Sequence, residues 1–183
     1  MASVADDIRT DLQLQSQTRD FEAFVEARRD AAVRLAYRLL GGDAATAEDV
    51  AQNAFLRAHR ALPRFRGDAA LSTWFHRILV GEVRRHQRWQ ALRRLWYSDA
   101  EVAETADPTP QSDPVLRRRI AEAMQRLTAA QREAFVLVHL EGFTIEQAAA
   151  ILGKATGTVK SHMHRALESL RNQLGDVAAA RSE

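Results

Sequence analysis

Apolar residues recur with a helical period in the last third of the chain. The longest stripe starts at Val159 and continues at Met163, Ala166, Leu167, Leu170 and Leu174. Spacings of three and four residues place side chains on one face of a helix with 3.6 residues per turn. The pattern therefore predicts an amphipathic helix, and Thr156 is expected to cap its start.

A shorter helix is predicted directly before this one. Its apolar positions are Ile145, Ala148, Ala149 and Leu152. Thr144 is followed three residues later by Gln147, which is the pattern of a capping box. Gly153 can take the left-handed conformation that ends a helix. Two helices joined by a short glycine turn predict a helix-turn-helix, whose second helix fits the major groove of DNA.

Three longer helices are predicted in the first half of the chain. The first covers residues 20–40 and ends at a pair of glycines. The second starts with Thr46 as its cap and ends before Pro63, because proline cannot continue a helix. Ser72 is expected to cap the third, which reaches about Tyr97.

The pattern as a whole predicts an all-α protein of two small helical domains joined by a flexible linker. The N-terminal domain is expected to be a three- or four-helix bundle of residues 20–97, and the C-terminal domain a four-helix unit of residues 113–175. Residues 98–112 contain two prolines and no apolar period, so they are interpreted as an acidic linker that reaches roughly 50 Å when extended. Residues 1–19 are expected to form a flexible N-terminus, and residues 176–183 a tail.

The C-terminal domain has two further helix signals. Pro114 is suited to the first position of a helix. Thr128 and Gln131 form a second capping box, and Gly142 is expected to close the helix that follows.

The amino-acid composition also favours a helical protein. The 183 residues include only 8 Gly and 4 Pro, few for a protein of many turns, and 46% are apolar, enough for real cores. No cysteine is present, which excludes disulfides and thiolate chemistry and fits a reducing cytoplasm. The longest apolar run has five residues, far below a membrane span, and the polar N-terminus does not resemble a signal peptide.

The net charge of +2 is small, but the charges are unevenly distributed. Residues 77–94 hold six arginines against Glu82 alone, and residues 154–171 hold four basic residues against Glu168 alone. Residues 98–113 hold five acids and no base. Two basic segments on either side of an acidic one predict two anion-binding surfaces.

No enzyme motif is present in the sequence. Lys154 follows a glycine but lacks the upstream glycine of a phosphate-binding loop. His162 and His164 lie two apart on a helix, so they point to nearly opposite sides and cannot chelate one metal ion. We therefore expect no catalytic residue, metal, cofactor or small-molecule substrate.

Candidate binding residues lie on three of the predicted helices. The last helix exposes hydrogen-bond donors, while an ordinary pair of packed helices is the alternative. The third helix combines arginines with tryptophans, which suits unpaired DNA, although a solvated basic face and core aromatics would look similar. The second helix has a polar face of Asp49, Gln52, Asn53 and Arg57, with Leu56 at its edge, and a solvated face is equally compatible with it.

Three sequence blocks resemble the bacterial RNA polymerase sigma factors of the extracytoplasmic-function subfamily. Residues 47–57, AEDVAQNAFLR, resemble the helix that in this family docks on the clamp helices of the largest polymerase subunit. Residues 65–68 and 74–78 are similar to the loop and helix that capture the melted minus-ten strand. Residues 157–166 resemble the recognition helix for the minus-thirty-five element. The resemblance covers roughly residues 20–97 and 113–174.

The resemblance implies roles for three sets of residues in this sequence. Core-polymerase binding is implied for Asp49, Gln52, Asn53, Phe55, Leu56 and Arg57. Contact with the minus-ten DNA is implied for Arg64, Phe65, Arg66, Asp68, Trp74, Arg77, Arg84, Arg85 and Arg88. Contact with the minus-thirty-five DNA is implied for Thr156, Thr158, Lys160, Ser161, His164 and Arg165.

The chain departs from the family pattern at three positions. Gly81 stands where the family usually has asparagine, and Arg85 where an acid is expected. Asn53 stands where an acid is common. The first two changes fall within the helix that the resemblance assigns to the minus-ten element.

The function implied is that of a cytoplasmic, non-catalytic promoter-specificity subunit. Its implied partners are core RNA polymerase, promoter DNA and an anti-sigma factor. Two alternatives remain open. One is a stand-alone helix-turn-helix regulator that binds duplex DNA without polymerase, and the other is a helical module that binds an acidic protein through its basic faces.

Overall fold

This computed structural model describes residues 2–96 and 114–179, which form helices without a strand. The N-terminal half consists of α1 (Ala2–Leu40), α2 (Ala44–Ala61), the short 3-10 helix η1 (Leu62–Arg64) and α3 (Leu71–Trp96). The C-terminal half consists of α4 (Pro114–Arg126), α5 (Ala129–Phe135), the π-helical η2 (Val136–Leu140), α6 (Ile145–Leu152) and α7 (Thr156–Ala179). The all-α prediction is confirmed, whereas the predicted linker lies outside the described residues.

The first three α-helices form a bundle around aromatic and leucine side chains. Phe75 of α3 is at its centre, with its ring 4.4 Å from that of Phe55 and 5.5 Å from that of Phe24. Leu35 and Leu79 are completely buried beside it. Small residues such as Ala51 and Ala54 on α2 let the helices approach closely, which fixes the position of α2 against α3.

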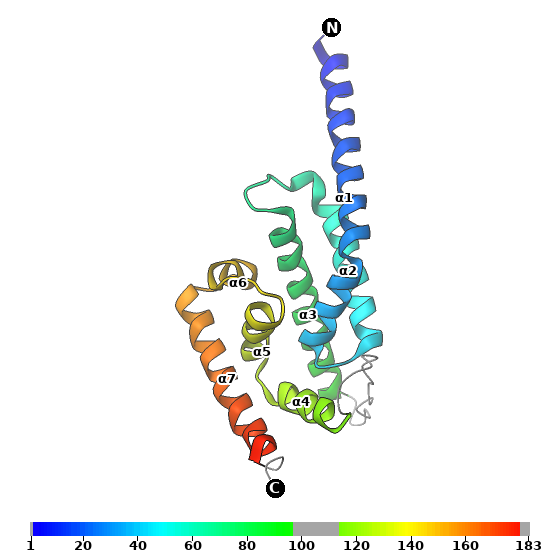
Figure 1. Ribbon diagram of the computed structural model, residues 1–183. Helices are drawn as coiled ribbons and strands as arrows, with labels where there is room; N and C mark the ends of the chain where they lie inside the picture. Colours follow the sequence, from blue (N-terminus) through cyan, green and yellow to red (C-terminus); the bar gives the residue numbers. More distant parts are fainter. Residues whose placement is uncertain (1, 97–113, 180–183) are drawn as a thin grey trace.

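Helix α1 starts earlier than the sequence pattern indicated. It begins at Ala2, so residues 2–19, which were expected to be a flexible N-terminus, belong to this helix. Neither glycine nor proline occurs between residues 2 and 40, so nothing in the local sequence interrupts the helix. Its N-terminal part extends beyond the rest of the molecule (Figure 1).

Three predicted helix starts are wrong by one to three residues. Asp43, not Thr46, caps α2, and its carboxylate accepts a hydrogen bond of 3.0 Å from the Thr46 amide. Helix α3 begins at Leu71, so Ser72 lies inside it. Helix α7 begins at Thr156, and the carbonyl of Ala155 accepts the first helical hydrogen bond, from the Val159 amide. Such boundaries shift because several capping residues compete locally.

The two capping boxes and the glycine turn predicted for the C-terminal half are confirmed. Thr128 and Thr144 each form a complete capping box with the glutamine three residues later. Gly153 ends α6 in the left-handed conformation, with φ of 64°. Helix α7 continues to Ala179, beyond residue 175, where the domain was expected to end.

The two halves are packed against each other, which the sequence did not predict. Helices α3 and α6 lie side by side, and α5 lies between α3 and α7 (Figure 1). Leu137 of η2 and Ile151 of α6 belong to the same buried cluster as Leu79 of α3. Helices α2 and α7 therefore lie on opposite sides of one continuous hydrophobic core.

Gly153 offers a test of the turn that orients α7. A Cβ at this position would meet no atom within 4 Å, so only the positive φ opposes a side chain. We expect Gly153→Ala to lower the free energy of unfolding by about 1 kcal/mol. Gly157→Ala is the matched control, because Gly157 is helical, equally open and without positive φ. Urea denaturation of both variants checks this, and equal stability would contradict it.

Candidate nucleic-acid interface

A cleft of about 430 Å³ opens between α2 and α3. Its lining combines four arginines with one aromatic and one aliphatic side chain around a glycine: Arg57, Trp74, Arg77, Ile78, Gly81, Arg85 and Arg88. A Cβ built on Gly81 meets no atom within 4 Å, so the absence of a side chain there leaves the middle of the cleft open. Guanidinium groups around an aromatic ring can bind phosphates and stack a base, which is the chemistry of single-strand binding.

A buried carboxylate positions two of these arginines. Glu82 is 2% exposed, and its two oxygens lie 2.6 Å from Arg57 and 2.5 Å from Arg85. Because Arg57 belongs to α2 and Arg85 to α3, this carboxylate ties the two walls of the cleft together. Glu82 was visible in the sequence as the lone acid of a basic segment, and its proximity to Arg85 follows from helical spacing. The contact with Arg57 did not follow from any sequence signal.

The loop before α3 is anchored at the end of the cleft. The ring of Phe65 lies 4.9 Å from that of Trp74, which holds the loop against the first turns of α3. The polar residues of this segment, Arg64, Arg66 and Asp68, are exposed. Five of the nine residues implied for the minus-ten DNA thus line the cleft or contact its tryptophan: Phe65, Trp74, Arg77, Arg85 and Arg88.

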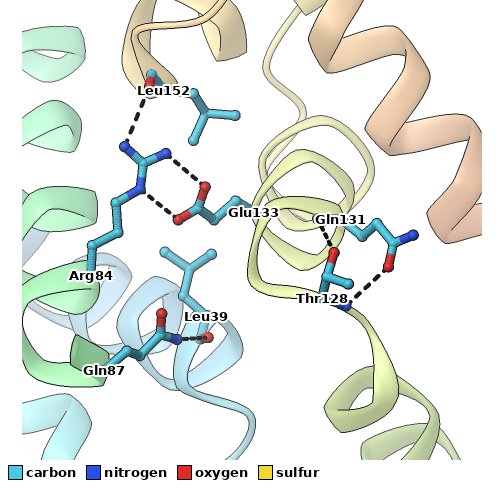
Figure 2. A network of polar contacts seen from close by, with 7 residues as sticks. All are labelled: Leu39, Arg84, Gln87, Thr128, Gln131, Glu133 and Leu152. Carbon is cyan, nitrogen blue, oxygen red and sulfur yellow. Dashed lines mark hydrogen bonds and ion pairs between the residues drawn. The ribbon is translucent and has the colours of Figure 1, made fainter. Parts of the chain in front are cut away.

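Arg77 and Arg84 of the same set instead contact the C-terminal half. Arg77 Nε donates to the carbonyl of Ala150 at 2.7 Å. Arg84 forms two hydrogen bonds of 2.7 Å with the carboxylate of Glu133, and Figure 2 shows this pair between α3 and α5. The hydrogen bond to Glu133 raises the pKa of Arg84, so its guanidinium stays charged. Sequence reasoning missed Glu133 entirely.

The polar face of α2 is open to solvent. Asp49, Gln52 and Asn53 are exposed, and Leu56 keeps 49% of its surface accessible. Phe55 differs from them, because it is half-buried and its ring stacks on Phe75 of the core. The α2 face, defined here as residues 49, 52, 53 and 56, therefore consists of three polar side chains around one apolar side chain.

The N-terminal part of α7 presents a second open surface. Val159 and Ala166 are fully buried against the rest of the C-terminal half. The residues implied for the minus-thirty-five DNA are all exposed: Thr156, Thr158, Lys160, Ser161, His164 and Arg165. The alternation of buried and exposed positions gives a helix with one face open to solvent, as docking into a groove requires.

His76 lies where the two halves meet, and the sequence gave no sign of this. Its Nδ1 lies 2.5 Å from the carbonyl of Ser72, and its ring is 4.9 Å from that of Phe143 on the other half. Burial is the largest influence on the pKa of His76 and lowers it, and the charge of Arg28 lowers it slightly further. The backbone hydrogen bond to Ser72 and the charge of Glu141 raise the pKa by smaller amounts than burial lowers it. The neutral imidazole therefore belongs to the packed arrangement.

Two findings concern only the part of the chain that is described. No group of histidine, aspartate and glutamate residues there could hold a metal ion. No helix among those residues combines the length and apolar character needed to cross a membrane.

Comparisons with known proteins agree on both halves. Residues 24–93 match the family model of Sigma-70 region 2, and residues 117–170 match that of Sigma-70 region 4. The chain is 40% identical to the ECF RNA polymerase sigma factor SigM of Mycobacterium tuberculosis over 139 residues, which are 75% of this chain and 69% of SigM. It is 32% identical to SigW of Bacillus subtilis over 86% of this chain and 90% of SigW.

A solved structure resembles the arrangement of both halves. It is the sigma factor RpoE in complex with the anti-sigma factor NepR, from Bartonella quintana. The TM-score is 0.76 at 28% identity, and the match covers 86% of this chain and 98% of RpoE.

The burial of His76 is expected to make the folded protein less stable in acid. Because burial lowers its pKa below the ordinary 6.5, the unfolded chain takes up this proton at a higher pH than the folded chain. The stability that the neutral side chain contributes is fully present above pH 6.5. It is lost as the pH falls towards the pKa of His76 in the folded protein, by about 1.4 kcal/mol for each unit by which folding lowers this pKa. We expect His76→Phe, which can still pack on Phe143, to flatten the fall in unfolding free energy between about pH 7.5 and about pH 5. Identical pH profiles would contradict the assignment.

Proposed function

Because this chain belongs to the extracytoplasmic-function sigma factors, the promoter-specificity subunits of RNA polymerase, we propose that its two halves hold the polymerase and the promoter at separate faces. The N-terminal domain, residues 20–97, binds core polymerase through the α2 face and captures the minus-ten strand along the cleft. The C-terminal domain, residues 113–175, docks α7 at the minus-thirty-five element. The observation that carries this proposal is the cleft, where four arginines surround Trp74 and the space above Gly81.

The energetics favour capture of an unpaired strand in the cleft. Unstacking a base step costs a few kcal/mol. Stacking one base on an aromatic side chain contributes about 1–3 kcal/mol, and arginine–phosphate contacts add to it. A cleft with one tryptophan therefore offsets the opening of one or two steps, and polymerase must contribute the rest.

In this proposal the polymerase catalyses transcription and this chain catalyses no reaction. The chain acts in the cytoplasm, where polymerase and DNA are found. We further propose that an anti-sigma factor binds this chain. The support is the similarity to RpoE, which was solved with the anti-sigma factor NepR.

A stand-alone helix-turn-helix regulator is the competing function. It would bind duplex DNA tightly without polymerase, usually as a dimer on a palindrome. The match of residues 24–93 to Sigma-70 region 2 favours the sigma factor, because a stand-alone regulator does not need a polymerase-binding region.

Gel filtration with core polymerase, followed by run-off transcription, is expected to separate these functions. The chain should co-migrate with core polymerase and direct initiation from a restricted promoter set. Tight duplex binding without co-migration would support the regulator instead. Co-migration with no change in promoter choice would support a protein-binding module.

Substitutions on the two exposed faces are expected to have opposite effects. Lys160→Ala or Arg165→Ala should reduce promoter use by roughly 5- to 150-fold, since each removes a DNA contact worth about 1–3 kcal/mol, while polymerase binding is unchanged. Asp49→Ala or Gln52→Ala should weaken polymerase binding and leave duplex binding by α7 intact. Filter binding and polymerase pull-down measure the two effects. Parallel losses in both sets would refute the division of labour.

A further inference from the structure

Among the described residues, the side chains that line the cleft donate hydrogen bonds and offer no free acceptor. The charged ones are arginines, which only donate, and the indole of Trp74 also only donates. Ile78 and Gly81 carry no polar side-chain atom. The carbonyls of α3 accept hydrogen bonds within the helix. A ligand in the cleft is therefore recognised through acceptors of its own.

The carboxylate next to the cleft, that of Glu82, is occupied by two of these arginines. Its two oxygens bind Nη1 of Arg57 and Nη2 of Arg85, and its side chain is 2% exposed. The two arginine side chains remain 63% and 60% exposed, so each keeps further N–H donors that can reach a ligand. Glu82 thus fixes the direction of both guanidinium groups without using up their donors.

Gly81 and Arg85 are the two positions of α3 where the chain departs from the family pattern, and both departures remove an acceptor. An asparagine at 81 and an acid at 85 would each supply one. Here position 81 is open, since a Cβ would meet no atom within 4 Å, and position 85 is a donor. The two residues lie one helical turn apart, about 6 Å along the axis, so the guanidinium can reach the space above the glycine.

The four DNA bases differ in what they present to such donors. Guanine has two neighbouring acceptors, O6 and N7, which one arginine binds with two hydrogen bonds. Thymine has the acceptor O4 next to its methyl group. Adenine and cytosine carry an amino group at the corresponding position, and an amino group that faces a guanidinium leaves donors on both sides without a partner. A cleft lined by donors therefore favours the keto bases, and guanine most.

We propose that the cleft selects a guanine of the unpaired strand, and that Arg85 reads this base by binding O6 and N7 in the space above Gly81. This inference rests on the proposed function and names the base that the same site takes. Trp74 precedes Gly81 by two turns of α3, roughly 10 Å, so it stacks a neighbouring base of the same strand. The other arginines of the cleft are left for the phosphates.

The preference is measured with the full-length chain bound to core polymerase, at a single salt concentration because phosphate contacts vary with salt. The probes are fluorescent single strands of deoxycytidine in which one central base is guanine, thymine, adenine or cytosine. The guanine strand should bind about tenfold more tightly than the adenine and cytosine strands, with thymine between them. Core polymerase alone supplies the background. Equal affinity for the four strands would overturn the proposal.

Two base analogues test the contact without any change to the protein. The analogue 7-deazaguanine lacks N7, so it should lose most of the advantage of guanine. Hypoxanthine keeps O6 and N7 and lacks only the amino group, so it should bind as tightly as guanine. An advantage that follows the amino group instead would refute recognition by Arg85.

The variant Arg85→Gln tests the reading residue. A side-chain amide pairs with N6 and N7 of adenine, so the ratio of guanine to adenine affinity should fall from about ten to about one or below. Arg88→Gln is the matched control, because it removes the same charge from the same cleft. It should weaken all four strands by a similar factor and keep the ratio. A ratio lost in Arg88→Gln and kept in Arg85→Gln would contradict the assignment.

Failure of the proposed function gives a different result from failure of this inference. If the cleft captures no strand, binding in the presence of the chain will not exceed that of core polymerase alone for any base, which would overturn both. If the cleft captures the strand without reading it, all four strands will bind above this background with equal affinity. That second result would overturn the guanine preference and leave the proposed function standing.

Discussion

The pairing of Arg84 with Glu133 is the interaction on which the arrangement of the two halves depends. A buried ion pair contributes little net stability, because the cost of removing both charges from water offsets most of their attraction. It contributes orientation, however, since breaking it leaves a carboxylate in a poorly hydrated site. Here the arginine keeps 35% of its side chain exposed, so the penalty is smaller than for a fully buried pair. That combination suits a contact that specifies one arrangement of the halves at a modest cost in desolvation.

Helix α3 carries three kinds of contact on three faces. Phe75 and Leu79 point into the bundle core, Trp74 and Arg85 line the cleft, and Arg84 meets the C-terminal half. Arg77 lies on the boundary, because it lines the cleft and also donates to α6. One helix therefore carries residues that line the cleft and residues that contact α5 and α6.

Local structure could be predicted well from the sequence, because its causes are local. The capping boxes at Thr128 and Thr144 and the left-handed turn at Gly153 each depend on residues within four positions of one another. The start of α2 was misplaced because Asp43 and Thr46 are both good caps, and only the folded backbone decides between them. The exposed faces of α2 and α7 could be predicted from the helical period, since the exposed polar positions follow once the buried stripe is known.

The packing of the halves could not be predicted in the same way. A helical period shows which face of a helix is buried but does not show which element covers that face. Glu133, for example, pairs with Arg84, which lies 49 positions earlier in the chain. The arginines of α3 were interpreted by their charge alone, which suits a phosphate and a carboxylate equally. Sequence reasoning therefore identified arginine donors on α3 but could not show that acceptors of the C-terminal half engage two of them. Arg84 binds the Glu133 carboxylate, and Arg77 binds the Ala150 carbonyl.

A DNA phosphate and the Glu133 carboxylate differ, as acceptors for an arginine, in their response to salt. Phosphate contacts are made at the surface of a polyanion and release condensed counterions, so their strength falls steeply as salt rises. The contact with Glu133 is largely buried, so mobile ions screen it much less. Rising ionic strength thus weakens a phosphate contact of Arg84 much more than its contact with Glu133. Binding of a DNA strand in the cleft is therefore expected to depend on salt, whereas the contact between α3 and α5 is expected to persist as salt rises.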